Sequence, residues 1–401
     1  MKQPINQPWV VHVGAGTWQS SAILSMRALG FRTLAVDGSA LSAGFKLADE
    51  HLVVDISRSD AVETAVREFF FERNTAPVAV VCTACEVGML SAANLRDRYG
   101  LPGTGLALAR RLTNKGAQRR AWMDLASPRF VVLSDPFENI YSHLTELRTE
   151  KVIIKPIDSS GSRGISVVAR SFIVPEQLKH ASQLSSNGEI IIEEFIEGKE
   201  YAVESIRLSG LSYPILVTYK DKVVDTNSTV ANLLKTASLT SFQENQIRHL
   251  LASAHDALSY DNGVCHTEII EDMEGHFWLV ETAGRGAGFG VSEHFIKYAT
   301  GYDYFETSLR FDLGMQISMP SPSLPLMISA VRFIETIPGR FISIKNESNV
   351  AIQQLISSGE LMSAPETDGD RIGYFYVNGA SSQIVDTKIN ETLSKIFIQV
   401  D

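Results

Sequence analysis

The sequence has few cysteines and no long hydrophobic run. Three cysteines in 401 residues are too few for a disulfide framework, which indicates a reducing compartment. Apolar runs of about 18 residues or more are absent, so we expect no membrane-spanning helix. The chain begins MKQPINQPWVVHVGAG, without the basic and apolar regions of a signal peptide, and we therefore expect a cytoplasmic protein.

An excess of positive charge is also absent. The formal net charge is −10, and no long basic run occurs. We therefore expect neither a nucleic acid nor a membrane as a partner, although a local basic site for phosphates is compatible with this composition. The hydrophobic content of 44% is that of a globular protein, and the length predicts about two to three domains.

The first hundred residues alternate apolar strand patterns with helical ones, which predicts βαβ units on a parallel sheet. The turn GAGTWQ follows the first strand and Asp37 follows the second, as in a dinucleotide-binding fingerprint. Gln19 replaces the third glycine of that fingerprint. A structural doubly wound domain is therefore favoured over a site for a hydride-carrying cofactor.

The remaining chain mixes strand and helix patterns. LARRLTNKGAQRRAWM predicts a basic helix with Lys115, residues 151–208 have the pattern of hairpins, and residues 241–260 predict an amphipathic helix. SMPSPSLP (residues 318–325) predicts a linker, because its prolines cannot continue a helix or a central strand. A small α+β unit follows, with strands expected over LMISAVRFIET and RIGYFYVNG and helices over NVAIQQLISSG and INETLSKIFIQ.

Two glutamates in GVCHTEIIEDMEGHFWLVETAGRG indicate a metal site. With a two-residue turn between them, Met273 pairs with His276 and Glu268 falls directly opposite Glu281. Opposed residues of an antiparallel pair have Cβ atoms about 4.5–5.5 Å apart, where two carboxylates repel. A Mg²⁺ ion would remove the repulsion and would fill its other positions with water and phosphates. Two exposed edge glutamates are the alternative.

A lysine in the apolar stretch VIIKPIDSSGSRGISVV indicates an anionic partner. Lys155 extends from a β-branched run, where an unpaired ammonium is costly. The loop after it can direct N–H groups and hydroxyls toward phosphate oxygens, with Ser160, Gly161, Ser162 and Gly164 as candidates. The alternative is a mobile hairpin with a snorkelling lysine.

A strand end in EIIIEEFIEGKEY is a candidate nucleoside site. Exposed backbone groups of Glu193, Glu194, Phe195 and Ile196 can contact an adenine edge, and Glu200 can accept both ribose hydroxyls. A charged hairpin tip is the alternative.

In this order, these elements resemble the ATP-grasp superfamily, and most of all its carboxylate–amine ligases related to carbamoyl-phosphate synthetase large chains, biotin carboxylase and the purine-pathway ligases. The resemblance covers nearly the whole chain and implies a mixed α/β and α+β fold. Its parts would be a Rossmann-like pre-ATP-grasp domain (1–110), an ATP-grasp domain (111–317) with a lid subdomain (about 146–208), and a C-terminal lobe (326–401).

The resemblance also implies roles for the nucleotide-binding candidates. Lys115 and Lys155 match two lysines that contact the nucleotide phosphates, and the serine-glycine loop matches a lid that keeps water from an acyl-phosphate. Residues 193–196 match the adenine-contacting hinge, and Glu200 matches the ribose-binding acid.

The same resemblance assigns the reaction centre. Glu268 and Glu281 match two magnesium-binding acids, and Arg285 matches an arginine near the acyl-phosphate. Many members have an asparagine as a further metal ligand where this chain has Ala283, so the number of metal ions stays open.

The implied reaction uses ATP and Mg²⁺, with Mn²⁺ as a substitute, to activate a small-molecule carboxylate as an acyl-phosphate. An amine then forms an amide or peptide bond, and ADP and phosphate are released. The segment ETAGRGAGFGVSEHF resembles amino-acid ligases of natural-product pathways, which favours an amino acid substrate. Related enzymes are often dimers, so a homodimer is one candidate assembly.

Three other functions stay open. An ATP-dependent carboxylase or a formate-using purine enzyme would use the same site with a different acid. An NAD(P)-dependent oxidoreductase would use GAGTWQ and Asp37. A nucleotide sensor would bind ATP without turnover.

Overall fold

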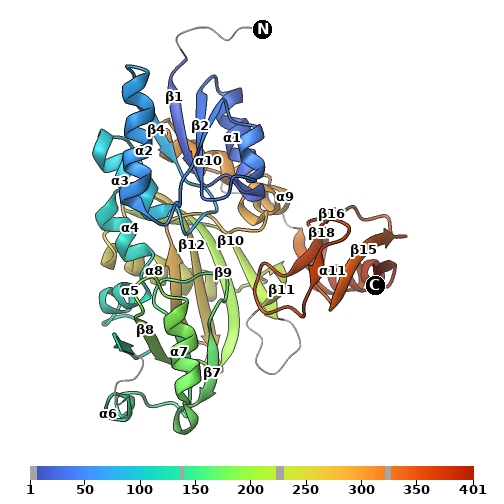
Figure 1. Cartoon of the computed structure of the whole chain (residues 1–401). Coiled ribbons are helices and arrows are strands. Elements are labelled where there is room, and N and C mark those ends of the chain that lie inside the picture. Colours follow the sequence, from blue (N-terminus) through green and yellow to red (C-terminus); the bar gives the residue numbers. More distant parts are fainter. Residues whose placement is uncertain (1–6, 136–139, 223–229, 321–326) are drawn as a thin grey trace.

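The computed structural model describes residues 7–135, 140–222, 230–320 and 327–401, and the strands in these ranges form four sheets (Figure 1). Helices lie on both faces of the first sheet, and the large central sheet runs down from it. None of the helices in these ranges is long and apolar enough to cross a membrane.

The N-terminal sheet is parallel, with the strand order β3-β2-β1-β4. Its elements are β1 (Trp9–Val13), α1 (Ser20–Ala28), β2 (Arg32–Asp37), β3 (Glu50–Val53), α2 (Ser59–Glu72), β4 (Pro77–Val81) and α3 (Met89–Tyr99). Side chains that alternate along β1 enter two cores: Val11 packs with α2 and α3, and Val10 packs with α1. The predicted doubly wound α/β unit is confirmed.

The side chains of the turn that resembles a dinucleotide fingerprint form hydrogen bonds with other groups of the protein. Asp37 accepts hydrogen bonds from the backbone N–H of Ala15 at 2.7 Å and of Ser39 at 2.9 Å. The buried Gln19 side chain donates to the carbonyl oxygens of Thr83 and Ala84. Both side chains therefore have a structural use within this domain.

A second, antiparallel sheet has the order β5-β8-β6-β7. Its strands and the helices near it are β5 (Phe130–Leu133), α6 (Tyr141–Leu144), β6 (Lys151–Pro156), β7 (Ser166–Ala169), α7 (Pro175–Gln183) and β8 (Ile190–Glu194). The expectation of hairpins alone over residues 151–208 was wrong, because α7 separates β7 from β8. Pro175 begins this helix, and Leu178 and Ala181 bury its inner face.

The central sheet has eight strands in the order β13-β12-β9-β10-β11-β14-β18-β16. Their bounds are β9 (Gly198–Leu208), β10 (Leu211–Lys222), β11 (Ala231–Thr236), β12 (Gly263–Asp272), β13 (Phe277–Ala283), β14 (Ile328–Glu335), β16 (Ile352–Gln354) and β18 (Arg371–Gly379). Helix α8 (Ser241–Ala257) buries Ile247, Leu251 and Ala254, as the amphipathic pattern predicted. Since β11 pairs with β14, the sheet continues into the C-terminal region.

The C-terminal region corrects two predicted helices. NVAIQQLISSG contains the strand β16, which pairs with β18, and INETLSKIFIQ is helical only up to Leu393, where α11 (Ser382–Leu393) ends. The residues after it form β19 (Ile396–Val400), in a sheet with β15 (Gly339–Asn346) and β17 (Leu361–Met362). Ile396 and Ile398 alternate onto the core in the two-residue period of a strand. Most of the predicted linker, residues 321–325, lies outside the described ranges.

The basic stretch after residue 106 forms two helices, α4 (Leu106–Leu112) and α5 (Lys115–Ala121). Asn114 caps α5 by accepting a hydrogen bond from the N–H of Ala117. Gln118 exchanges two hydrogen bonds of 2.9 Å with the backbone of Thr282 on β13, and Arg119 donates to the carbonyl of Val280 at 2.6 Å. Because β13 is an edge strand, these buried side chains satisfy backbone groups that another strand would otherwise pair.

Three short helical segments follow β13: the π-helical Val291–Phe295, α9 (Ile296–Thr300) and α10 (Tyr304–Asp312). Phe305 and Leu309 of α10 pack into the core of the N-terminal sheet, so this segment joins the central sheet to the first domain.

Gly198 begins β9, directly after the connection between the second and the central sheet. A Cβ atom at this position would collide with the backbone carbonyl of Glu271 on β12. We predict that Gly198→Ala lowers the free energy of unfolding by about 1–3 kcal/mol. Lys199→Ala, at the exposed neighbouring position, is the control and should change it by less than about 0.5 kcal/mol. Equal stability of the two variants in urea unfolding would contradict the model of a tight β9–β12 contact.

Candidate functional site

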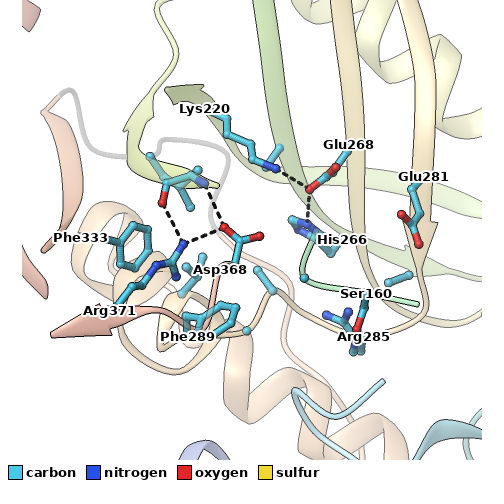
Figure 2. A pocket seen from close by; sticks show the side chains of 18 residues that line it. Ser160, Lys220, His266, Glu268, Glu281, Arg285, Phe289, Phe333, Asp368 and Arg371 are labelled. Atoms are coloured by element: carbon cyan, nitrogen blue, oxygen red, sulfur yellow. Dashed lines mark hydrogen bonds and ion pairs between the residues drawn. The ribbon is translucent and has the colours of Figure 1, made fainter. Parts of the chain in front are cut away.

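A cavity of about 140 Å³ lies where the loop after β6, the central sheet and the C-terminal region meet (Figure 2). It brings together five of the predicted site residues with polar and aromatic side chains that the sequence did not indicate. The main lining residues are Ser160, Gly161, Lys220, His266, Glu268, Glu281, Arg285, Phe289, Phe333, Asp368 and Arg371.

Glu268 and Glu281 face each other across β12 and β13, as predicted. The predicted turn was wrong, since the N–H of Asp272 donates to the carbonyl of His276, which leaves three residues in the turn instead of two. A bulge at Val280, which has no residue opposite it, shifts the register by one and restores the pairing of the two glutamates.

Each of these carboxylates lies beside a lysine. The Nζ of Lys220 on β10 donates to Glu268 at 3.1 Å, and the Nζ of Lys115 lies 3.2 Å from Glu281. Lys220 lowers the pKa of Glu268 well below its ordinary value, against the effect of burial. Both carboxylates are therefore charge-compensated by protein cations.

His266 adds a further cation next to Glu268. Its Nδ1 lies 2.5 Å from Glu204 Oε1, and its Nε2 lies 3.7 Å from Glu268. Burial alone would lower the pKa of His266, but the Glu204 carboxylate outweighs it and raises the pKa to about 9. The imidazole is therefore protonated at neutral pH.

Sequence reasoning missed Lys220, His266 and Glu204. Lys220 had a usable signal, because it follows the apolar run YPILVTY as Lys155 follows VII. His266 and Glu204 had none, since each lies among other polar residues of its strand and only the pairing of β12 with β9 places them together.

Arg285 follows β13 and reaches the N-terminal domain. Its Nε donates to Glu86 at 2.5 Å, and its Nη1 donates to the carbonyl of Gly286 at 3.0 Å. Burial would lower the pKa of Arg285, but Glu86 raises it, so the guanidinium stays charged. The same side chain also lines a second cavity of about 310 Å³, beside Arg96 and Asp312.

Lys155 has a protein anion as its partner. Its Nζ donates to Glu193 at 2.7 Å, and the Nε of Arg119 lies 2.8 Å from the other oxygen of this carboxylate. All three side chains are at least 90% buried. Lys115, at the start of α5, donates to the carbonyl of Ser159 at 2.5 Å and so contacts the serine-glycine loop.

The other residues predicted to bind the nucleoside lie at or near the connection between the two sheets. Glu194 is buried and accepts a hydrogen bond from the N–H of Arg148 at 2.7 Å. Phe195 and Ile196 connect β8 to β9, and Glu200 on β9 forms an ion pair with Lys222. The side chains of Glu193 and Glu194 thus have internal partners, and the backbone N–H groups of Glu194 and Phe195 donate to the carbonyls of Arg129 and Lys151.

The serine-glycine loop reaches the C-terminal region. Gly161, Ser162 and Gly164 have positive φ angles of 67°, 61° and 72°. The hydroxyl of Ser162 donates to Asp368 at 3.3 Å, and the N–H of Asp368 points at the carbonyl of Gly161 at 3.5 Å. Ser160 and Gly161 line the cavity from this side.

The donor set fits Mg²⁺ that is bound together with phosphates. Glu268 and Glu281 offer carboxylate oxygens from facing positions, and Ala283 at the cavity wall offers no ligand. In the part of the chain that the structure describes, no group of three or more His, Cys, Asp or Glu side chains could hold a metal ion alone. An ion with two protein carboxylates needs water and phosphate for its other positions.

Part of the chain matches a known protein family. Residues 149–293 match the family model of the ATP-grasp domain. D-alanine–D-alanine ligase B of Pseudomonas syringae pv. tomato is 29% identical over 189 residues, which cover 45% of this chain and 56% of the relative. The match thus spans little more than half the length of this relative.

Two solved structures share the fold over almost the whole chain. The L-amino acid ligase from Bacillus licheniformis superposes with a TM-score of 0.81 at 18% identity, and covers 99% of this chain and 100% of its own. Phosphoribosylglycinamide synthetase from Anaerococcus prevotii gives a TM-score of 0.76 at 18% identity with the same coverage.

The ion pairs of Glu193 with Arg119 and Lys155 predict that the free energy of unfolding depends on pH in the acidic range. Burial alone would raise the pKa of Glu193, but Arg119 and Lys155 lower it to about 2 from the ordinary 4.5. Because the folded-state pKa is depressed, this carboxylate stabilises the fold above about pH 4.5, and the contribution is lost as the pH falls toward 2. Its size is roughly 3 kcal/mol.

We therefore expect Glu193→Gln to be destabilised by several kcal/mol at pH 7 and by clearly less at pH 3, in urea unfolding at both pH values. Glu197→Gln, an exposed position in the same segment, is the control and should follow the wild type. A Glu193→Gln deficit of equal size at both pH values would show that the carboxylate is not ionised in the folded protein.

Proposed function

This chain carries an ATP-grasp domain, as its sequence predicted, and we propose that it is an ATP-dependent carboxylate–amine ligase with an amino acid as one substrate. The observation that carries the proposal is the opposed pair Glu268–Glu281, which shares one cavity with Arg285 and the serine-glycine loop. The similarity to D-alanine–D-alanine ligase B and to an L-amino acid ligase supports an amino acid substrate.

In the proposed reaction, Glu268 and Glu281 would hold Mg²⁺, which neutralises phosphate charge when it is bound. Lys115 and Lys220 lie beside these carboxylates and can turn toward phosphate oxygens. Phosphoryl transfer depends on positioning and charge neutralisation more than on covalent help from the protein. These side chains supply both.

Arg285 is the group that we assign to the carboxylate under activation and to the acyl-phosphate. A carboxylate oxygen would attack the γ-phosphorus, and the bond to the β–γ bridging oxygen would break, which releases ADP. The amine nitrogen would then attack the acyl carbon, the C–O bond to phosphate would break, and the departing phosphate would take the proton of the amine. Arg285 stays protonated throughout, so it stabilises negative charge without transferring a proton.

The nucleotide is proposed to lie along the connection between the sheets. Lys155 would contact its phosphates, residues 193–196 would contact adenine through their backbone, and Glu200 would accept the ribose hydroxyls after release from Lys222. The loop with Ser160 and Gly161 would close over the phosphates and keep water from the acyl-phosphate.

The test is ADP release with Mg²⁺ and ATP against single amino acids and amino-acid pairs, with bicarbonate and formate included. We expect stimulation by an amino-acid pair, and Glu281→Gln should lower the rate roughly a hundredfold or more, because one metal-binding carboxylate is lost. Glu274→Gln, in the exposed turn of the same hairpin, is the matched control and should keep the wild-type rate.

The amino-acid assignment fails if bicarbonate or formate alone stimulates ADP release, which would indicate a carboxylase or a formate-using enzyme. Binding of ATP without stimulation by any acid would instead indicate a nucleotide sensor.

A further inference from the structure

The cavity has a second arginine that the proposed activation step does not use. Arg371 begins β18 and is 3% exposed, on the side of the cavity away from Glu281 (Figure 2). Its Nη2 donates to the carbonyl of Ala231 and to Asp368, both at 3.0 Å. Within the described ranges, its Nε and Nη1 are buried and have no hydrogen-bond partner. Buried guanidinium donors without an acceptor are rare and costly, which points to a missing anionic group.

The acids around Arg371 are already engaged elsewhere. Asp368 also accepts hydrogen bonds from the N–H of Ala231 at 2.9 Å and from Ser162 at 3.3 Å. Glu335 forms an ion pair with Arg332 at 2.7 Å, and Asp370 accepts from the N–H of Thr367. Burial lowers the pKa of Arg371 to about 10. Within the described part of the chain, Arg371 therefore has one ion pair, with Asp368, and two guanidinium donors that the neighbouring acids leave without an acceptor.

Two aromatic rings cover the faces of this guanidinium. Its carbon lies 3.5 Å from the ring centre of Phe333 and 4.5 Å from that of Phe289. Phe289 is half-buried, and its φ of +56° is a backbone conformation that non-glycine residues rarely adopt. It follows Gly288, around which there is open space. Phe289 is thus a cover that a small movement of this loop would shift, while Phe333 on β14 is a fixed wall.

Arg371 and Arg285 lie apart on the wall of the cavity, so each could face a separate anionic group. The carboxylate that becomes phosphorylated must lie near Glu268, Glu281 and Arg285. A carboxylate bound at Arg371 would lie at the side of the cavity away from Glu281 and Arg285, where it would not be activated. A ligase that joins two amino acids has one such group, the carboxylate of the amino acid that serves as the amine.

We infer that Arg371 binds the free carboxylate of the amine substrate, so that this substrate is an α-amino acid or a peptide rather than a simple amine. The inference rests on the proposed ligase function and makes the C-terminal region a specificity-determining part of the site. The product would be a dipeptide or longer peptide with a free C-terminus.

The test offers the enzyme two competing amines. ATP, Mg²⁺ and the twenty standard L-amino acids are supplied with an equal concentration of the corresponding amino-acid α-amides, whose α-carboxylate is blocked. Peptides and peptide amides are then quantified by mass spectrometry. We expect the wild type to favour free-acid products roughly tenfold to a hundredfold, the effect of one charge-assisted interaction. In Arg371→Gln this preference should fall to about one.

The control and the contradicting results separate specificity from folding. Arg332→Gln removes an arginine of β14 that also donates to a carbonyl of β11 but does not line the cavity, and this variant should keep the preference. Arg371→Lys keeps the positive charge but has fewer hydrogen-bond donors, so this variant should retain part of the preference for free-acid products. Equal use of acids and amides by the wild type overturns the inference, and this result does not depend on whether Arg371→Gln folds. An unchanged preference in a folded Arg371→Gln variant also overturns it. Absence of any ligated product from the wild type instead overturns the proposed function, and the inference with it.

Discussion

A buried carboxylate, Glu193, holds the parts of this protein in place. A charge removed from water must be compensated, and the two cations that compensate it come from different elements: Lys155 from β6 and Arg119 from α5. Arg119 also donates to the carbonyl of Val280, the bulged residue of β13. One carboxylate therefore ties the second sheet to the edge strand that carries Glu281. Because the serine-glycine loop connects two strands of the second sheet, this contact also fixes where the loop lies relative to the proposed metal site.

The register of that edge strand shows which parts of the site can be predicted from the sequence and which cannot. The facing position of Glu268 and Glu281 was predicted from a two-residue turn, but the turn has three residues and the bulge at Val280 corrects the register by one. Alternation along the strands indicated the hairpin. The bulge was not predictable, because it depends on Arg119 and Gln118 from α5, which contact β13 only in the folded chain.

The same division applies to the rest of the fold. Elements with a clear apolar pattern, such as β1 and α8, are predictable from the sequence. NVAIQQLISSG has a helical pattern but forms β16, because its pairing with β18 is a tertiary contact. In the site, the predicted residues lie in local motifs or within one hairpin, and residues whose partners lie on other strands, such as His266 and Glu204, were missed. Lys220 is the exception that a closer reading would have found, since a lysine in an apolar strand had already indicated Lys155. Arg371 and Asp368 have no local signal and join the cavity only because β14 and β18 extend the central sheet.

The proposed metal site explains why a lysine lies beside each of the two glutamates. Without a metal, Glu268 and Glu281 face each other at a distance where they repel, and Lys220 and Lys115 neutralise them. Arrival of Mg²⁺ with a nucleotide would supply this neutralisation and bring several phosphate charges to the same place. The lysines would then exchange carboxylates for phosphate oxygens with little movement. In this way the protein would keep its acids charged and its cations near the phosphates, so that little reorganisation would be needed when the proposed substrates bind.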